Sequence, residues 1–338
     1  EHEDTLALVA LVKAAAELVG KKGEASFDEL RVEGSRWRKG ETYIFVLDPD
    51  GNMLVHPDPK LEGKNQLELT DIHGKPIIRG LLASATAVAG KPGGWSHYQW
   101  PVPGGLLPRW KSSYVRLVKT SEEKRFIVGC GVYNDRMEKA FVVDSVRNAV
   151  ALLEAKGDAA LALFHDPKEP FLAKDSYIFV YDMNGNNLAF PAFPNLEGKN
   201  LLDWKDPQGT YIVHEVIKAA RRGSGWIEYL LPKPGESVST KKSSFVSRAK
   251  MGEKWVAVGC GVYFAGAPTL APVKKKMTAR ELMALVREGA TLLGKKGEAA
   301  FGELRQKGSK WFHDEIYFFV WSRDGTRVLH VQIGRAHV

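Results

Sequence analysis

The sequence has little cysteine and no long apolar segment. No apolar stretch reaches the roughly 18 residues that a membrane-spanning helix requires, so the 338 residues predict no such helix. The two cysteines, Cys130 and Cys260, occupy the same place in two copies of an apolar VGCGVY segment. We expect two unpaired core thiols, since a disulfide would need equivalent strands of two domains to touch. The cysteines have no further metal-ligating residues beside them, so we expect neither a metal nor a cofactor.

Catalytic motifs are also missing. The sequence contains no HExxH, Walker, dinucleotide-binding or G-x-S-x-G pattern, and no single motif that holds both Cys and His. The glycines of VGCGVY are the closest match to a glycine-rich phosphate-binding loop, but they lie within a predicted strand rather than before a helix. We therefore expect a protein that is not an enzyme. An enzyme with an unrecognised site is the weakest alternative.

Clustered positive charge is absent as well. The formal net charge is +8, but the basic residues are scattered as doublets such as Lys21-Lys22 and Arg221-Arg222. The longest run, Lys274 to Lys276, falls in a proline-containing segment. A nucleic-acid reader usually gathers its basic residues on one stripe, with exposed aromatic residues beside it. No nucleic-acid partner is expected.

What the sequence has instead is repetition. GKKGEASFDEL (20–30) returns as GKKGEAAFGEL (294–304), and VGCGVY (128–133) returns unchanged at 258–263. The spacing of about 130 residues between the VGCGVY copies exceeds that of solenoid repeats and matches an independent domain. We expect repeat 1 over 1–137, repeat 2 over 138–265, a linker over 266–277, and a partial repeat 3 over 278–332.

Both ends of the sequence differ from those of a typical complete protein. The first residue is Glu1 rather than Met, so the lack of a targeting segment is no evidence for the cytoplasm. Repeat 3 follows repeat 1 as far as His330, the counterpart of His56, and then stops matching. The last six residues, IGRAHV (333–338), are predicted to be a non-native tail, because a common sequencing-adapter stretch encodes them.

Each repeat predicts the same order of elements. In repeat 1, Leu8, Val12 and Val19 lie on one face of an amphipathic helix that ends at Gly20 or Gly23. The segment 134–139 is expected to run straight into the equivalent helix of repeat 2, which favours rigid coupling of the two repeats. The fold class is α+β, with helices packed on a five-stranded antiparallel sheet. The further elements expected are a short second helix, a hairpin (43–47 and 52–56), a helix (76–89) and three strands (95–100, 111–118 and 126–133).

The ordered motifs of repeat 1 resemble the single Cache domain. The resemblance covers repeat 1 (4–134), repeat 2 with substitutions (141–264) and the first half of repeat 3 (278–332). The motifs are Tyr-x-Phe-Val-x-Asp-x-x-Gly-x-x-Leu-x-His-Pro from Tyr43, Leu-x-Gly-Lys-Asn from Leu61, Gly-Gly-Trp-x-x-Tyr-x-Trp-Pro from Gly93, Lys-Ser-Ser-Tyr-Val from Lys111, and Val-Gly-x-Gly-Val-Tyr from Val128.

This resemblance implies a PAS-like sheet of five to six strands that binds small metabolites outside the cytoplasmic membrane, in the periplasm or as a secreted form. Members commonly precede transmembrane signalling modules such as chemoreceptors and histidine kinases. The expected partners are a small-molecule ligand and either a membrane-bound signalling protein or an output domain outside this sequence. The sequence itself shows no kinase or methyl-accepting region.

The resemblance places a pocket on a sheet face under the segment 57–74, where a mostly apolar site with a few convergent polar groups is required. Trp37 and Arg38 precede the first strand, where an aromatic ring and a guanidinium suit a carboxylate. Tyr98 and Tyr114 are expected to share a face. The alternative for every candidate is a structural role, and Lys111, retained as Lys242, favours it. The candidate ligand-binding residues are Trp37, Arg38, Tyr43, His56, Tyr98, Trp100, Lys111 and Tyr114.

Comparison of the copies indicates which repeat binds. Buried polar groups without partners cost about 1–3 kcal/mol, so a repeat that no longer binds a polar ligand is expected to shed them. Repeat 2 lacks such polar groups at five positions, although replacement of polar by apolar residues on an exposed surface would give the same pattern. The changes are Trp37 to Phe171, Arg38 to Leu172, His56 to Phe190, Trp100 to Leu231 and Tyr114 to Phe245.

We therefore expect repeat 1 to bind an organic acid or similar polar metabolite, and repeat 2 to serve as its structural partner. Closure of the loop over the sheet would then act on the N-terminal helix and on the neighbouring repeat. The alternative is a structural or interaction module whose pockets are filled by their own side chains.

Overall fold

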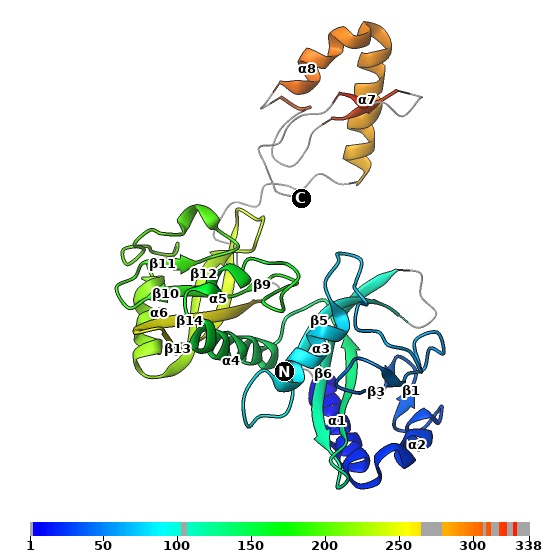
Figure 1. Ribbon diagram of the computed structural model, residues 1–338. Helices are drawn as coiled ribbons and strands as arrows, with labels where there is room; N and C mark the ends of the chain where they lie inside the picture. Colours follow the sequence, from blue (N-terminus) through cyan, green and yellow to red (C-terminus); the bar gives the residue numbers. More distant parts are fainter. Residues whose placement is uncertain are drawn as a thin grey trace. The chain divides into compact units, whose positions relative to one another are not determined.

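The computed structural model describes residues 3–102, 107–264, 279–306, 309–311, 318–322 and 327–329. The chain divides into two units, Glu1–Ala271 and Pro272–Val338, and each is described by itself. The first unit holds repeats 1 and 2, and the second holds the described part of repeat 3 (Figure 1). The expected linker (266–277) and C-terminal tail (333–338) lie outside the described residues.

Repeat 1 contains the five-stranded antiparallel sheet that the sequence predicts. Its strand order is β4-β3-β7-β6-β5, so β7, which carries the first VGCGVY copy, lies at the centre. A separate two-stranded ribbon, β1–β2, precedes the sheet. The elements are α1 (Glu3–Lys22), the 3₁₀ turn η1 (Gly23–Ser26), α2 (Phe27–Arg31), β1 (Arg38–Lys39), β2 (Thr42–Tyr43), β3 (Phe45–Leu47), β4 (Met53–Val55), α3 (Ile77–Thr86), β5 (Gly94–Pro101), β6 (Pro108–Lys119) and β7 (Arg125–Tyr133).

Helices cover both faces of this sheet. Helix α1 lies along β6 and β7, where Val12, Ala15 and Val19 are buried (Figure 1). Helix α3 packs on β5 and β6 within a second apolar cluster, which includes Leu81 and Tyr98. The two clusters lie on opposite faces of the sheet because strand side chains alternate between faces.

Repeat 2 has the same architecture, with sheet order β11-β10-β14-β13-β12. Helix α4 packs on β13 and β14 and also contacts β5 of repeat 1, while α6 packs within a second apolar cluster. The elements are α4 (Lys139–Lys156), α5 (Ala159–Leu163), β8 (Leu172–Ala173), β9 (Ser176–Tyr177), β10 (Phe179–Asp182), β11 (Asn187–Ala189), the 3₁₀ turn η2 (Pro194–Leu196), α6 (Ile212–Arg221), β12 (Ser224–Pro232), β13 (Ser239–Met251) and β14 (Lys254–Tyr263).

The segment between the repeats runs into α4 as expected. Helix α4 begins at Lys139, and the preceding residue Glu138 accepts a hydrogen bond from the Thr5 hydroxyl of α1 at 2.9 Å. The α4 side chain Asp144 accepts the backbone N–H of Trp95 in β5 at 2.8 Å. The start of repeat 2 is therefore hydrogen-bonded to two elements of repeat 1.

The β3–β4 turn shows why both repeats keep the same hairpin. The Asp48 carboxylate accepts the backbone N–H groups of Asp50 and Asn52 at 3.0 and 2.9 Å. Gly51 supplies the φ of 86° that the turn needs. Asn65 of the LEGKN segment donates to the Asp50 carbonyl at 2.8 Å, which fixes that segment against the turn. The asparagine of the Leu61–Asn65 segment therefore has a structural role.

Both cysteines are buried free thiols, as predicted. Burial raises the pKa of the Cys130 thiol to about 11. Each cysteine therefore stays protonated at neutral pH, and neither is a reactive thiolate.

The second unit contains two helices and one hairpin in its described part. An apolar cluster that includes Leu285 and Trp311 holds them together. The expected match to His56, His330, lies outside the described residues. None of the helices in the described part of the chain is long and apolar enough to cross a membrane. The elements are α7 (Ala279–Lys296), the 3₁₀ turn η3 (Gly297–Ala300), α8 (Phe301–Arg305), β15 (Val320–Trp321) and β16 (Arg327–Leu329).

Candidate functional site

A cavity lies between the sheet of repeat 1 and helix α3, on the face opposite α1. Most of its wall is apolar or aromatic, and its polar groups are one lysine, one histidine, two tyrosine hydroxyls and the indole N–H of Trp100. The lining residues are Tyr43 from β2, Phe45 from β3, Met53 from β4, His56 after β4, Ile77, Ile78 and Leu81 from α3, Tyr98 and Trp100 from β5, and Lys111 from β6.

The cover of this cavity is helix α3, which corrects one expectation. We expected the segment 57–74 to lie over the sheet face, but none of its residues lines the cavity. Leu67 and Leu69 instead pack at the edge of the same apolar cluster. Pro76 ends the loop in an extended conformation (ψ 118°), and α3 starts directly after it, which lays its apolar face on the sheet.

The cavity suits only a small ligand. Its empty volume is about 270 Å³, including space that is open to solvent, and a water-sized sphere has only about 20 Å³ in which to move. About 10–15 Å³ of such space is enough for one water molecule. A ligand larger than a few non-hydrogen atoms therefore requires α3 or the lining side chains to shift.

Lys111 is the cationic group of the cavity. Its side chain is 1% exposed, and its Nζ donates to the Tyr43 hydroxyl at 2.7 Å. The same Nζ lies 4.1 Å from the centroid of the Tyr43 ring and 5.2 Å from that of Tyr133. Burial lowers the pKa of Lys111 to about 8. Among the described residues, no carboxylate forms an ion pair with it.

Two glycines of the central strand make room for the cavity side chains. A Cβ atom at Gly131 would lie 2.3 Å from Cε of Lys111, and one at Gly129 would lie 2.4 Å from Cζ of Phe45. The VGCGVY glycines are therefore positions of close side-chain approach. Phe45 was not among the candidate residues from the sequence. Gly129 is the sequence signal that could have indicated it, because a glycine there leaves room for the Phe45 ring.

His56 is a neutral hydrogen-bond donor at the edge of the cavity. Its Nδ1 accepts the backbone N–H of Asp58 at 3.0 Å. Burial, and then the charge of Lys111, lower the pKa of His56 to about 4, so the ring is uncharged at neutral pH. A neutral imidazole whose Nδ1 accepts a hydrogen bond carries its proton on Nε2. The ring therefore keeps one N–H donor.

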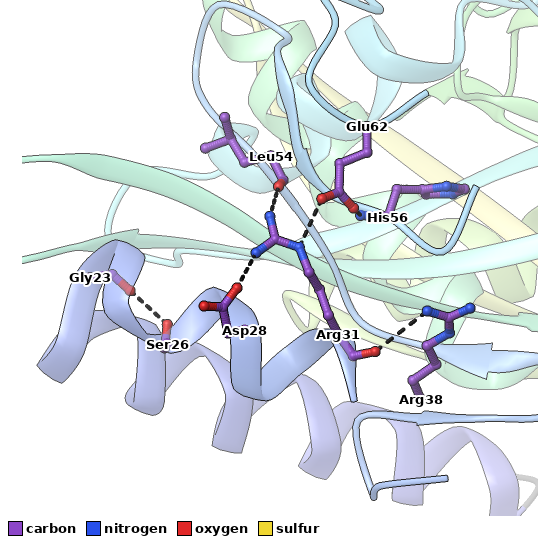
Figure 2. A network of polar contacts seen from close by, with 8 residues as sticks. All are labelled: Gly23, Ser26, Asp28, Arg31, Arg38, Leu54, His56 and Glu62. Carbon is purple, nitrogen blue, oxygen red and sulfur yellow. Dashed lines mark hydrogen bonds and ion pairs between the residues drawn. The ribbon is translucent and has the colours of Figure 1, made fainter. Parts of the chain in front are cut away.

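The backbone of His56 is fixed by a polar network that starts on α2. Glu62 accepts the His56 N–H at 2.8 Å through one carboxylate oxygen, and Nε of Arg31 at 2.8 Å through the other. Figure 2 shows the Arg31 guanidinium between Glu62, the Leu54 carbonyl and Asp28. The Arg31 side chain of α2 thus fixes the end of β4, and His56 follows directly after this strand.

Tyr98 and Trp100 complete the polar and aromatic wall. The Tyr98 hydroxyl lies 2.7 Å from the Ser113 hydroxyl, and burial raises its pKa. Trp100 makes edge contacts with His56 and Tyr98, at ring-centroid distances of 6.3 and 6.2 Å. Together with Tyr43, these groups place several hydroxyl and N–H donors around the Lys111 ammonium.

Three of the candidate residues lie elsewhere. Trp37 is buried in the α1 cluster, where its Nε1 reaches Glu29 at 3.4 Å. Arg38 donates to the Arg31 carbonyl at 3.4 Å, and Figure 2 shows its guanidinium apart from His56. We expected Tyr98 and Tyr114 to share a face, which is wrong: Tyr98 pairs with Lys111 and Tyr114 with Trp95, on opposite faces of the sheet.

Repeat 2 has a smaller cavity at the equivalent place, and it lacks the cationic wall. Its empty volume is about 200 Å³, with about 10 Å³ for a water-sized sphere. Phe190 and Leu231 stand where His56 and Trp100 stand in repeat 1, so two of the five substitutions from the sequence fall on the cavity. The lining residues are Phe179, Tyr181, Phe190, Trp204, Ile212, Val216, Tyr229 and Leu231.

The lysine of repeat 2 is enclosed by aromatic rings. Lys242 is fully buried, with Nζ 3.9 Å from the Tyr177 ring centroid and 4.8 Å from that of Tyr263. Its ammonium has no hydrogen-bond partner among the described residues. The Tyr177 hydroxyl lies 3.2 Å from the Tyr263 hydroxyl, whereas its counterpart Tyr43 accepts the Lys111 proton. Burial lowers the pKa of Lys242 to about 7.

Acidic and metal-ligating groups do not gather at either cavity. In the described part of the chain, no group of three or more His, Cys, Asp or Glu side chains is placed to hold a metal ion. Neither cavity has an acidic lining residue. The groups that line both cavities are hydrogen-bond donors and apolar or aromatic side chains.

Sequence models of two families match the chain. The model of the single Cache domain 2 family matches residues 29–148, and a Cache domain model matches residues 169–267. The chain is 41% identical over 91 residues to the sensor histidine kinase MctS of Rhizobium johnstonii. It is 32% identical over 90 residues to the methyl-accepting chemotaxis protein McpP of Pseudomonas putida. These matches cover 27% and 26% of this chain, and only 19% and 16% of the two relatives.

Solved structures of sensor domains are also similar. A periplasmic sensor domain of a chemotaxis protein is 33% identical, with 36% of this chain and 90% of that chain covered and a TM-score of 0.31. A Cache chemosensory domain, described for carboxylic acid recognition, is 29% identical, with 32% of this chain and 70% of that chain covered and a TM-score of 0.29.

Proposed function

Starting from a chain that carries two Cache domains in tandem, we propose that it is a sensory module whose repeat 1 binds a short-chain organic acid beneath α3. The observation that carries this proposal is the Lys111 ammonium, which lines the cavity and has no anionic partner among the residues that the structure describes. A buried charge is costly unless it is paired. A ligand carboxylate supplies the missing partner.

The other polar groups of the cavity favour the same ligand. The Nε2–H of His56 and the hydroxyls of Tyr43 and Tyr98 are donors that suit carboxylate oxygens. The α3 side chains Ile78 and Leu81 suit a short apolar tail. Amino acids are less favoured, because their ammonium group would find no acidic lining residue.

The comparisons support a role in signal transduction. The curated relatives are a sensor histidine kinase and methyl-accepting chemotaxis proteins, and a similar solved structure is a periplasmic sensor domain. The chain spans less than a fifth of the length of those relatives. We therefore propose that the repeats sense the acid outside the cytoplasmic membrane and that an output module, on this chain or a partner, receives the signal.

The test is calorimetric titration of the full chain with acetate, propionate, butyrate and succinate. Lys111→Met keeps the volume of the side chain and removes its charge. It should weaken binding by about tenfold or more, since a hydrogen bond to a charged group contributes about 1.5–3 kcal/mol. Lys242→Met is the matched control in repeat 2 and should leave the affinity unchanged. Unchanged affinity in Lys111→Met, or a loss confined to Lys242→Met, would move the site away from repeat 1.

A structural module without a ligand is the second candidate. The observation that favours it is the small free space in both cavities. In that case the aromatic rings fill the site themselves, and Lys111 is stabilised by the Tyr43 and Tyr133 rings alone. The same titration separates the two functions: no heat with any of these acids favours the structural module.

A further inference from the structure

One buried lysine and one half-buried lysine form contacts between repeats 1 and 2 beside the cavity. Lys75, just before α3, donates through Nζ to the Leu172 carbonyl of β8 at 2.9 Å. Lys174, in the β8–β9 turn, donates through Nζ to the Ser112 hydroxyl of β6 at 2.9 Å and to the Arg136 carbonyl at 2.8 Å. We call these contacts the lysine clasp. They join one short turn of repeat 2 to two elements of repeat 1.

Lys174 occupies a backbone position that suits glycine. Its φ is 58°, and the residue at the same turn position in repeat 1 is Gly40, with a φ of 61°. A residue with a side chain is disfavoured in this left-handed region. Repeat 2 nevertheless carries a lysine there, and its side chain extends to Ser112 of repeat 1. On the way, Nζ lies 5.2 Å from the ring centroid of Phe141 in α4 of repeat 2. The contact it makes is a reason for the exchange of glycine for lysine.

The lysine reaches the back of the cavity wall. Ser112 follows Lys111 on β6, so the two side chains point to opposite faces of the sheet. Across the strand pair, Ser112 is opposite His97 and Lys111 is opposite Tyr98. The Ser112 hydroxyl lies 2.9 Å from Nδ1 of the buried His97 and accepts the Lys174 proton. Lys174 is therefore held by the residue directly behind the ligand-facing lysine.

Lys75 is attached to the cover of the cavity. Its backbone N–H donates to Asp71 at 3.0 Å, and the other oxygen of Asp71 accepts the backbone N–H of Gln99 in β5 at 3.1 Å. Ile77, two residues later, begins α3 and lines the cavity. A shift of α3 thus acts on Lys75 through only one intervening residue.

The equivalent positions of repeat 2 lack these groups. Thr210 stands where Lys75 stands, and the exposed Glu228 stands where His97 stands. Ser243, the counterpart of Ser112, is buried, and its hydroxyl has no partner among the described residues. Among the described residues, a lysine binds this serine in repeat 1 and none does so in repeat 2. The clasp is thus a feature of this pair of repeats rather than of the repeat fold.

Beyond the clasp, the β8–β9 turn leads to the cavity region of repeat 2. Ser176 of β9 contacts Cys260 and the Gly261 carbonyl of the central strand. The next residue, Tyr177, packs on the ammonium of Lys242. The segment from Leu172 to Tyr177 therefore touches the cavity cover of repeat 1 at one end and the lysine site of repeat 2 at the other.

We propose that the lysine clasp transmits occupancy of the repeat 1 cavity to repeat 2. This inference rests on the proposed function, because the signal it carries is the shift of α3 and β6 when an acid binds. Lys75 and Lys174 act as positioning residues and do not touch the ligand. A ligand changes a distant element only if its contacts differ between two states of that element, and the clasp supplies such a contact.

The test is hydrogen–deuterium exchange of the full chain with and without saturating sodium acetate or propionate. In the natural sequence, the acid should slow exchange in α3 and also in β9 and β10 of repeat 2. In Lys75→Thr/Lys174→Gly, which installs the residues found at the equivalent positions of the other repeat, slowing should remain in α3 and be lost from β9 and β10. Lys218→Ala, on the exposed face of α6, is the control and should behave as the natural sequence. Equal slowing of β9 and β10 in the double variant overturns the proposal, as does slowing that never passes beyond repeat 1.

A second arm needs no ligand and separates this proposal from the proposed function. Ile78→Val removes one methylene group from α3 at the cavity. It should speed exchange in α3, β9 and β10 while the clasp is present, and in α3 alone when Lys75 and Lys174 are replaced. If neither acid affects α3, the proposed function fails and this arm alone decides. Equal acceleration of β9 and β10 with and without the two lysines refutes transmission through the clasp.

Discussion

A single methyl group at Gly131 tests how the cavity is built. A Cβ atom there would lie 2.3 Å from Cε of Lys111 and 2.4 Å from the Ser113 hydroxyl. Non-bonded carbon atoms normally stay about 3.5–4.0 Å apart, so the Lys111 side chain has to move by more than about 1 Å. It has little room, because its ammonium lies between the rings of Tyr43 and Tyr133.

Gly131→Ala should therefore weaken both the fold and ligand binding. Overpacking of a filled interior costs about 1–3 kcal/mol, and we expect the free energy of unfolding to fall by that amount. Displacement of Nζ should weaken acid binding by about tenfold or more, because a hydrogen bond to a charged group is lost. Urea unfolding followed by circular dichroism measures the first effect, and calorimetric titration measures the second.

Two glycines elsewhere provide the controls. At Gly225 in β12, an added Cβ meets only the Ala219 methyl group, at 3.7 Å, so Gly225→Ala should leave stability unchanged or slightly raised. At Gly261, the added Cβ would lie 2.6 Å from Cε of Lys242, so Gly261→Ala should lower stability without changing acid affinity. The reasoning is refuted if Gly131→Ala binds and unfolds like the natural protein, or if Gly261→Ala weakens binding equally.

The pH dependence and the α2 network provide two further predictions. Because burial lowers the pKa of Lys111 to about 8, acid affinity should be level from about pH 6 to 7 and then fall as the pH rises through about 8, and calorimetry of Lys111→Met should show no such fall. The pKa of Lys111 is lower in the folded than in the unfolded protein, so the cost of burying its charge is full below about pH 8 and falls as the pH rises further. Any gain in the free energy of unfolding that Lys111→Met brings should therefore shrink towards pH 10. A gain that widens with pH in urea unfolding contradicts the assignment. Glu62→Gln removes the charge that Arg31 and the His56 N–H share, and should lower stability by about 1 kcal/mol and weaken acid binding. Glu197, the counterpart of Glu62 in repeat 2, accepts the backbone N–H of Phe190. Glu197→Gln should lower stability alone, and equal loss of binding in both variants would contradict this role for Glu62.

The sequence was sufficient for the architecture because the copies confirm one another. The hairpin around Asp48 and Gly51 depends on local turn chemistry, and the same residues recur at Asp182 and Gly185. The last three strands of repeat 1 are segments rich in apolar and aromatic residues, and each begins and ends within a few residues of its predicted limits. Local hydrogen bonding and strand composition are properties of the chain itself, so they can be predicted without tertiary contacts.

The cavity was only partly predictable. Tyr43, His56, Tyr98, Trp100 and Lys111 were candidates and do line one cavity. Alternation along one strand fixes two faces but not which face a neighbouring strand shares with it. That depends on register, which separates Tyr114 from Tyr98.

Two further features required the folded chain. Arg38 was a candidate because a guanidinium suits a carboxylate, but its side chain bonds the carbonyl at the end of α2 instead. The contribution of Ile78 and Leu81 depends on where α3 lies on the sheet, and no local pattern encodes that placement.

The enclosed lysine of repeat 2 has a consequence for its chemical reactivity. A lysine with a pKa of about 7 is partly uncharged at neutral pH and is then a nucleophilic amine, unlike surface lysines. Its complete burial under Tyr177 and Tyr263 shields it from reagents in solution. Acylation of Lys242 therefore requires repeat 2 to open, and its rate should measure that opening.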